Sequence, residues 1–194
     1  MALPNSHKIV IGTSIVVADT TDHAPTAAYN LGTRTDQIDC TDLIAGTARQ
    51  SAKLDFTANR DLEYTLGAAI EWETTPEVVA GETVDFYIGW SNSATATDAN
   101  PGALTGSDAA YAGNAAGTLA DSLKQLDYIG SMSMDNVINT DTIGVQIDTL
   151  IGTFSAKMRY GMLVVVNSSA LAAFHSDMAE TSFLISPNVF QTQD

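Results

Sequence analysis

LEYTLGAAIEW (residues 62–72) and VDFYIGW (residues 84–90) are the two stretches that decide the fold class. In both, apolar or aromatic side chains occupy every second position, and Glu, Thr, Gly and Asp hold most positions between them. Successive side chains of a β-strand point to opposite faces, so this period of two predicts two strands that each bury one face. Pro76 and Gly81 lie between the stretches and predict a hairpin or corner connection.

The same alternation recurs along the chain, and with β-branched runs it predicts roughly eight to ten strands, about a dozen residues apart. The further strands are expected at residues 9–11, 15–17, 52–56, 126–134, 143–154, 160–166 and 183–185. A bulge is expected near Leu150, and the last strand is expected to close at Pro187. This rhythm predicts an all-β fold, an antiparallel, jelly-roll-like β-sandwich, although periodicity leaves the strand order open.

Helices are expected to be few and short. Residues 119–126 have apolar side chains at helical spacing after Thr118, a candidate N-cap, and another short turn is expected at residues 169–178. Residues 91–117 are small, polar and poor in charge, so they cannot build a packed core of their own. Loops this long are usually functional or ordered by a partner. Residues 26–194 are expected to form a single β-sandwich domain, with residues 1–25 as an N-terminal arm or the first strands.

The chain has 194 residues, and its 23 Asp and Glu against 8 Lys and Arg give a formal net charge of −15. Lys and Arg are the residues that neutralise phosphate groups, so neither nucleic acid nor an anionic membrane is an expected partner. The acidity is interpreted first as a source of solubility and of repulsion between free copies. The alternative is that acidic residues collect divalent cations or meet a basic partner surface.

Cys40 is the only cysteine, so an intramolecular disulfide cannot form and synthesis in a reducing compartment is expected. It follows Ile38 at period two, and both side chains are expected in the core. The N-terminus lacks the features of a signal peptide, and the longest apolar runs are too short to span a bilayer. We therefore expect a protein that is made in a cytoplasm and either stays soluble there or leaves by a route that needs no signal, such as lysis.

No pattern of catalytic, cofactor-binding or metal-ligating residues is found. Nucleophile-elbow, P-loop and dinucleotide motifs are missing, and the three histidines lack metal-ligand spacing. His7 and His23 are expected in a solvated N-terminal segment. His175 and Asp177 are interpreted as a loop pair rather than a catalytic dyad.

Carboxylates are abundant, and a few of them have a functional interpretation beside a plainer one. Glu71 and Glu73 share the outward face of a strand, which suits an acid/base pair or a cation site but more commonly is a solvated face. The other candidate cation ligands, which lack a complete calcium-loop motif, are Asp36, Asp39, Asp42 and the turn signature at residues 98–102.

Aromatic and basic residues leave two further alternatives. Trp72 and Trp90 are in phase with the apolar face of their strands, so core packing is favoured over a sugar-stacking platform. Lys157 and Arg159 share one strand face, because they are two positions apart. They either meet an acidic neighbouring subunit or belong to an ordinary connection.

Four stretches carry a family resemblance: AIEWE (residues 69–73), VDFYIGWS (residues 84–91), the small-residue loop at 93–108, and RYGMLVVVN (residues 159–167). Together with the C-terminal strand ending in Ile185-Ser186-Pro187, they resemble virion structural proteins of tailed bacteriophages, and head decoration (capsid cement) proteins in particular. The resemblance implies a β-sandwich or jelly-roll subunit that binds the major capsid protein. It also implies a homotrimer or other closed homo-oligomer, synthesis in the bacterial cytoplasm and localisation to the virion.

The leading hypothesis is therefore a non-enzymatic capsid decoration subunit that stabilises the shell through many repeated contacts. Its N-terminal segment up to Pro25 is expected to be an arm that orders on the capsid. The alternative is a tail- or fibre-associated module that recognises host-surface glycan through exposed aromatic rings, such as Tyr111 or Trp90. An enzyme, for example a small glycan hydrolase, would need a cleft with two convergent carboxylates, and no pattern favours it.

Overall fold

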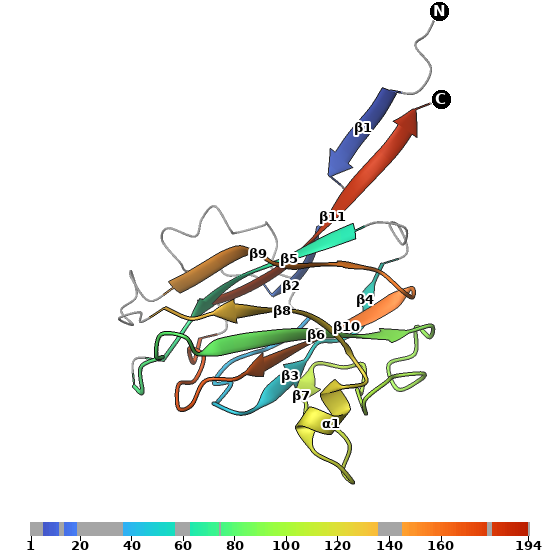
Figure 1. The fold of residues 1–194 in the computed structure, drawn as a ribbon. Helices are drawn as coiled ribbons and strands as arrows, with labels where there is room; N and C mark the ends of the chain where they lie inside the picture. Colours follow the sequence, from blue (N-terminus) through green and yellow to red (C-terminus); the bar gives the residue numbers. More distant parts are fainter. Residues whose placement is uncertain are drawn as a thin grey trace, which may run out of the picture.

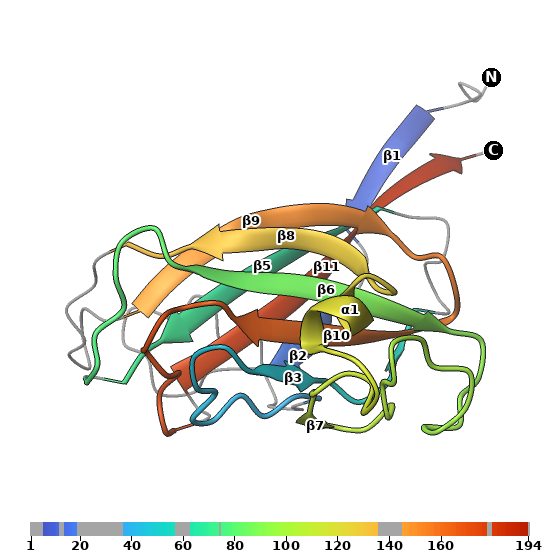
Figure 2. The same ribbon diagram turned by 60° about the horizontal axis from the view of Figure 1, so that its bottom comes forward.

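The computed structural model describes residues 6–11, 14–18, 37–56, 63–73, 75–135, 145–177 and 180–193. They form two antiparallel sheets that pack face to face, as Figures 1 and 2 show. The predicted all-β sandwich with little helix is thereby confirmed. Alternation of apolar and polar side chains is enough to predict this class, because each sheet buries one face against the other.

Each sheet is named here after one of its inner strands, β5 or β6. The β5 sheet has the order β1 (Ser6–Ile11), β11 (Thr181–Gln193), β5 (Glu63–Glu71) and β9 (Val145–Ser155), and β2 (Ile15–Ala18) also pairs with β11. The β6 sheet has the order β7 (Ala109–Ala110), β3 (Ala48–Gln50), β10 (Tyr160–Asn167), β6 (Thr83–Ser91) and β8 (Asp127–Ser133), and β4 (Leu54–Asp55) pairs with β10. Helix α1 (Leu119–Leu123) follows the predicted N-cap Thr118, whose side chain accepts a hydrogen bond from the Asp121 backbone N–H.

Aromatic side chains from both sheets form the centre of the main core. Trp72 and Phe174 are fully buried, and their rings meet edge to face with centroids 5.0 Å apart. Phe86 of the β6 sheet meets Phe183 of the β5 sheet in similar geometry at 5.6 Å. Such pairs stabilise a fold beyond the area that they bury. The side chains that alternate in phase with Trp72 thus point inward, as predicted.

The C-terminal strand is longer than the sequence predicts. Strand β11 does not close at Pro187 but continues to Gln193, so that prediction was wrong. Pro187 pairs with Tyr64 of β5 on one side. On the other side it lies between the stretch that pairs with β2 and the stretch that pairs with β1. A proline lacks the backbone N–H, and the structure places it at this gap between two partner strands.

Two local predictions have opposite outcomes. The expected bulge near Leu150 is confirmed, because the register between β5 and β9 shifts between Leu66 and Ala68, opposite this part of β9. The short helical turn expected at residues 169–178 is wrong for residues 169–177, which form bends and an isolated bridge. Side-chain hydrogen bonds of Asn167 hold this connection in place of helical ones.

Strands β8 and β9 close one side of the sandwich, although they belong to different sheets (Figure 2). A Cβ atom at Gly130 of β8 would collide with the carbonyl oxygen of Ile151, and one at Gly152 of β9 would collide with that of Ile129. The two backbones therefore approach at a distance that only glycine permits. This contact fixes how the two sheets are placed relative to each other.

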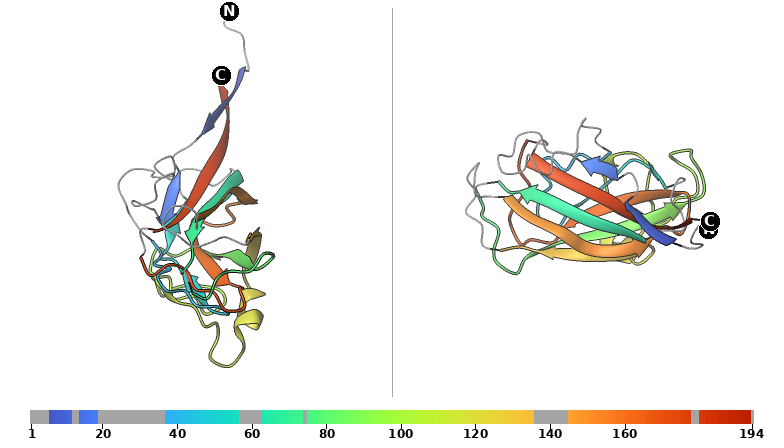
Figure 3. Two further views of the ribbon diagram at one scale, coloured as in Figure 1. Left: turned by 90° about the vertical axis from the view of Figure 1, so that its left-hand side faces the viewer. Right: turned by 90° about the horizontal axis from the view of Figure 1, so that it is seen from above.

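A two-stranded ribbon projects from the sandwich. It consists of β1 and the last part of β11, which pair from Ser6↔Gln193 to Ile11↔Asn188. Figure 3 shows the ribbon standing clear of both sheets, and Ser6 pairs with Gln193 at its outer end. We call this feature the β1–β11 ribbon.

Candidate functional site

The long segment at residues 91–117 is ordered by the chain itself. Its apolar side chains pack with α1 against the outer face of the β6 sheet, and Figure 1 shows α1 below this sheet. Leu104 and Tyr111 are buried there, and the Tyr111 hydroxyl donates a hydrogen bond to the Gly102 carbonyl at 2.6 Å. Burial raises the pKa of the Tyr111 phenol. The segment lacks a core of its own, as its composition predicts. Its apolar side chains pack instead with side chains of the β6 sheet in a common hydrophobic cluster, so no partner protein is needed to order it.

Lys53 organises the first part of this segment. Its ammonium group lies 2.7–2.9 Å from four oxygen atoms: the Ser91 hydroxyl and the carbonyls of Ser93, Thr95 and Asp98. An ammonium has three N–H groups, so one of them is shared between two acceptors. Burial lowers the pKa of Lys53, and the Asp98 carboxylate partly offsets this effect. The turn at residues 98–102 therefore binds the Lys53 ammonium through the Asp98 carbonyl. A metal ion was the second interpretation of this turn from the sequence.

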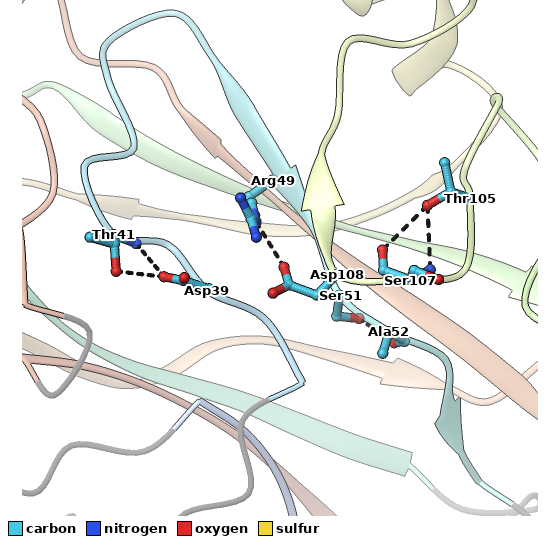
Figure 4. Close-up of polar contacts among 8 residues, drawn as sticks. All are labelled: Asp39, Thr41, Arg49, Ser51, Ala52, Thr105, Ser107 and Asp108. Atoms are coloured by element: carbon cyan, nitrogen blue, oxygen red, sulfur yellow. Dashed lines mark hydrogen bonds and ion pairs between the residues drawn. The ribbon is translucent and has the colours of Figure 1, made fainter.

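Strand β3 fixes the other part of the segment (Figure 4). The Arg49 guanidinium donates to the Asp108 carboxylate at 2.7 Å, and the buried Gln50 side chain accepts a hydrogen bond from the Thr105 backbone N–H at 2.8 Å. These contacts join residues that are more than fifty positions apart in the sequence. The segment is consequently a structural layer on the β6 sheet.

The aromatic residues proposed for sugar stacking are buried. Trp72, Trp90 and Tyr111 are 0%, 8% and 3% exposed, so a platform built from Trp90 or Tyr111 is wrong. The Trp90 indole N–H donates to the Asp127 carboxylate at 2.7 Å, which satisfies its polar atom at the edge of the core. Alternation had favoured core packing for both tryptophans, and that interpretation is confirmed.

The paired carboxylates Glu71 and Glu73 differ in their surroundings. Glu71 is 2% exposed, so the expected solvated face is wrong at this position. The reason is that the connection preceding β11, which is distant in the sequence, crosses here. The His175 backbone N–H donates to the Glu71 carbonyl, and the Glu73 backbone N–H donates to the Ala173 carbonyl. Glu73 is partly exposed, and its carboxylate accepts a hydrogen bond from the Ser176 backbone N–H at 2.6 Å.

The candidate metal and nucleophile residues do not come together in the part of the chain that the structure describes. No group of three or more His, Cys, Asp and Glu side chains is arranged there to hold a metal ion. The Asp39 carboxylate instead accepts hydrogen bonds from the backbone and hydroxyl of Thr41, and Asp42 is exposed. The remaining candidates are placed as follows: Asp36 and His23 lie outside the described residues, His7 lies in β1, and His175 accepts a hydrogen bond from the Asp177 backbone N–H.

Cys40 is buried, as predicted. Burial strongly raises the pKa of its thiol. A neutral thiol is a poor nucleophile, so Cys40 acts as a small apolar side chain in the core.

The basic pair on the connection before β10 is neutralised within the chain. Lys157 lies 2.7 Å from the Asp127 carboxylate, and Arg159 lies 3.1 Å from that of Asp55. Both pairs are exposed to solvent, so each contributes little to stability. These contacts favour the ordinary connection over a contact that needs an acidic neighbouring subunit.

Three connections meet at the end of the sandwich opposite the β1–β11 ribbon, at the left in Figure 2. They are residues 41–47, 75–82 and 167–177, and we call this region the three-loop end. The buried Asn167 amide donates to the carbonyls of Leu43 and Ala172 at 2.7 and 2.8 Å and accepts from the Ser169 backbone N–H at 3.0 Å. Both N–H groups and the oxygen of the Asn167 side chain are therefore hydrogen-bonded, and they join the loop at residues 41–47 to the loop at residues 167–177.

Glu82 joins the third connection to this arrangement. Its two carboxylate oxygens accept hydrogen bonds from the backbone N–H groups of Val79 and Ala170, both at 2.8 Å. Hydrogen bonds to an ionised carboxylate are stronger than those between neutral groups. The polar hubs Asn167 and Glu82 thus bring the exposed side chains of Ile44, Val79 and Leu171 to one end of the molecule.

Sequence reasoning did not find the three-loop end. Ile44, Val79 and Leu171 lie far apart in the chain, and a single exposed aliphatic residue is normal on a protein surface. The only signal in the sequence is the presence of these aliphatic residues within turn-rich connections. Their convergence depends on the strand order, which periodicity does not reveal.

An exposed aromatic side chain lies on the outer face of the β6 sheet. Tyr128 of β8 is 56% exposed, and its ring lies 5.2 Å from that of Tyr87 on the neighbouring strand, centroid to centroid. Hydroxyl groups of Ser131 and Ser168 donate to the Asp85 carboxylate beside this pair. The face therefore combines one accessible ring with a cluster of polar oxygen atoms.

No protein-family model matches this chain, and no curated protein is significantly similar to it in sequence. Within the described residues, no helix is long and apolar enough to cross a membrane.

Proposed function

We propose that this chain is a non-enzymatic structural subunit of a tailed-bacteriophage virion, and specifically a capsid decoration subunit that binds the major capsid protein. The observation that carries the proposal is the β1–β11 ribbon. A two-stranded ribbon is only marginally stable in water without further contacts. Among the described strands, β1 pairs with β11 alone, which leaves the other edge of β1 available to a partner strand.

The charge distribution supports a surface that faces away from packaged DNA. The chain carries a formal net charge of −15. The cations whose side chains the structure describes are engaged with carboxylate or carbonyl oxygens, and they are Arg49, Lys53, Lys124, Lys157 and Arg159. Such a surface repels nucleic acid and also keeps free copies of the chain apart.

Oligomerisation is part of the proposal. A closed ring of copies, such as a homotrimer on a symmetric position of the shell, would multiply weak single contacts into strong overall binding. The like charge of the copies opposes their association in free solution. We therefore propose that the ring forms on the capsid, and that the ribbon supplies contacts that hold it there.

The test is co-sedimentation of the purified chain with capsids prepared without it, at increasing chain concentration. We expect saturable binding at a copy number that matches the symmetry of the shell. Deletion of residues 189–194 removes most of the β11 half of the ribbon and should weaken binding by about 100-fold, because the ladder that supports β1 is lost. The thermal unfolding midpoint of the deletion variant shows whether the sandwich is intact, and a complete lack of saturable binding by the full chain would reject the function.

A second candidate function is recognition of a host-surface glycan, and Tyr128 is the observation that favours it. Aromatic rings stack on the apolar faces of sugars, and a nearby carboxylate such as Asp85 binds sugar hydroxyl groups. The site differs from the one expected from the sequence, because Trp90 and Tyr111 are buried while Tyr128 is exposed.

Isothermal titration against soluble oligosaccharides from the host cell wall distinguishes the two functions. If the glycan function holds, Tyr128→Ala should abolish binding, whereas Tyr128→Phe should retain most of it because the stacking ring remains. Absence of any heat from the unmodified chain would remove this candidate and leave the decoration function as the only one.

A further inference from the structure

We propose that the three-loop end is a docking surface for a protein partner whose contact patch is apolar at its centre and ringed by Lys and Arg. This inference deepens the proposed function and rests on it, because it assigns a second contact site to the same structural subunit. The β1–β11 ribbon and the three-loop end lie at opposite ends of the sandwich (Figure 2). A subunit with a contact at each end can bridge two neighbouring proteins of a shell.

Three aliphatic side chains are exposed on the neighbouring loops of the three-loop end. Ile44 is 58% exposed, Val79 is 60% exposed and Leu171 is 72% exposed. Scattered apolar residues on a surface need no explanation, whereas a group of them at one place indicates an interaction site. These three make up half of the large apolar side chains that the described part of the chain exposes.

Hydrogen bonds hold the backbone of these loops in place. Leu171 stands between Ala170, which is bonded to the Glu82 carboxylate, and Ala172, which is bonded to the Asn167 amide. Val79 is bonded to the same Glu82 carboxylate, and Ile44 follows Leu43, whose carbonyl accepts from the same Asn167 amide. The exposed side chains therefore need little ordering when a partner binds, which lowers the entropic cost of association.

The charged side chains around the apolar ones are acidic. Asp42 and Glu77 are exposed, and each precedes one of the aliphatic residues by two positions. Asp177 is exposed on the third loop, and no Lys or Arg occurs in the described residues of these three loops. A partner with a basic rim complements this charge, while a second copy of the acidic end is repelled.

The cations nearest in the sequence do not change this charge. Arg49, which follows the first loop, is held by Asp108 at 2.7 Å, so its charge is balanced within the chain. The occupant that fits the three-loop end is therefore a basic protein surface and not another copy of this chain.

The experiment uses the full-length chain and capsids prepared without it, with the dissociation constant measured by co-sedimentation. The test variant combines Ile44→Ser, Val79→Ser and Leu171→Ser, and the matched control is Leu150→Ser on β9, whose side chain is 61% exposed. We expect the triple variant to bind on the order of 100-fold more weakly, because three apolar contacts are lost, and the control to bind like the unmodified chain. Circular dichroism and the unfolding midpoint verify that both variants are folded.

The charged rim is tested separately with Asp42→Asn and Glu77→Gln, which remove charge and keep shape. We expect the double variant to bind several-fold more weakly at low salt, with a smaller difference at high salt, because salt screens the attraction. Equal or tighter binding of this variant at low salt would overturn the assignment of a basic partner.

The outcomes separate this inference from the proposed function. If the unmodified chain binds capsids and the triple variant binds equally well, the docking surface is rejected while the proposed function stands. If Leu150→Ser weakens binding as much as the triple variant, the effect is not specific to the three-loop end and the inference is also rejected. If the unmodified chain does not bind, the proposed function and this inference fall together.

Discussion

Residues 91–117 and the three-loop end are both built from connections between strands, but they place their apolar side chains in opposite directions. Leu104 of the first region is 5% exposed and packs on the β6 sheet, whereas Leu171 of the second is 72% exposed. Each region also has a polar hub: the charged Lys53 ammonium in the first, and the buried, neutral Asn167 amide in the second. The long loop is therefore a part of the fold, while the short connections form the surface that is open to a partner.

Of the substitutions that test the difference between these two regions, Asn167→Ala is expected to change the free energy of unfolding most. The substitution leaves the Leu43 and Ala172 carbonyls and the Ser169 N–H without their partner, and it should lower the free energy of unfolding by about 4 kcal/mol. Urea denaturation measures the change. Asn114→Ala is the control, because the exposed Asn114 side chain bonds only to a nearby backbone N–H and should cost less than about 1 kcal/mol. Equal costs for the two variants would contradict the role of Asn167 as the hub of the three-loop end.

The next largest effect on the free energy of unfolding is expected when Leu104 and Leu171 are each replaced by alanine. Leu104→Ala should lower the free energy of unfolding by about 3 kcal/mol, because it leaves a cavity between the 91–117 segment and the β6 sheet. Leu171→Ala should change it by less than about 0.5 kcal/mol, because the side chain is already exposed. Thermal and urea denaturation of both variants give the values, and a large cost at Leu171 would show that this side chain is packed in solution.

Lys53→Met should have a smaller effect on global stability, about 1 kcal/mol, because the Lys53 side chain is itself partly exposed to solvent. The local effect should be clearer, since the carbonyls of the loop lose the cation that gathers them. Amide hydrogen exchange should accelerate in residues 91–98 and remain unchanged at the three-loop end. Lys124→Met, which removes an exposed ion pair on α1, is the matched control and should leave residues 91–98 protected.

The smallest effect concerns α1, which follows the 91–117 segment. Hydrogen bonds from Lys124 and Thr118 hold the pKa of Asp121 below its ordinary value of 3.8. Because the pKa is lowered on folding, the stabilisation is present above the ordinary pKa and is lost as the pH falls through the lowered one. NMR titration of the Asp121 carboxyl should show this low pKa in the unmodified chain and a higher one in Lys124→Met. Lys157→Met, whose partner is Asp127, should leave the Asp121 titration unchanged.

Particular residues show how far the sequence could predict the molecule. The period of two placed Trp72 and Trp90 in the core, and the capping preference of Thr118 located the start of α1. The solvated face expected at Glu71 was wrong, because a distant connection covers that strand end. The closure expected at Pro187 was wrong as well, because β11 has different partner strands before and after the proline.

The candidate surfaces were harder to predict than the fold. Tyr111 was a reasonable candidate for an exposed ring, because it lies in a segment without apolar periodicity, yet that segment packs on the β6 sheet. Ile44, Val79 and Leu171 have no common motif, and their meeting place follows from hydrogen bonds of Asn167 and Glu82. Long-range contacts of this kind leave no local pattern in the sequence.

Composition and the alternation of side chains were sufficient to predict the class of this protein: an acidic, all-β chain whose strands each bury one face. This information is local, because the alternation of side chains follows from the covalent backbone of a single extended strand. The order of the strands, the packing of the 91–117 segment and the meeting of side chains at the three-loop end became visible in the folded chain alone. Those features depend on contacts between segments far apart in the chain, and their free energy is gained only when both sheets have formed.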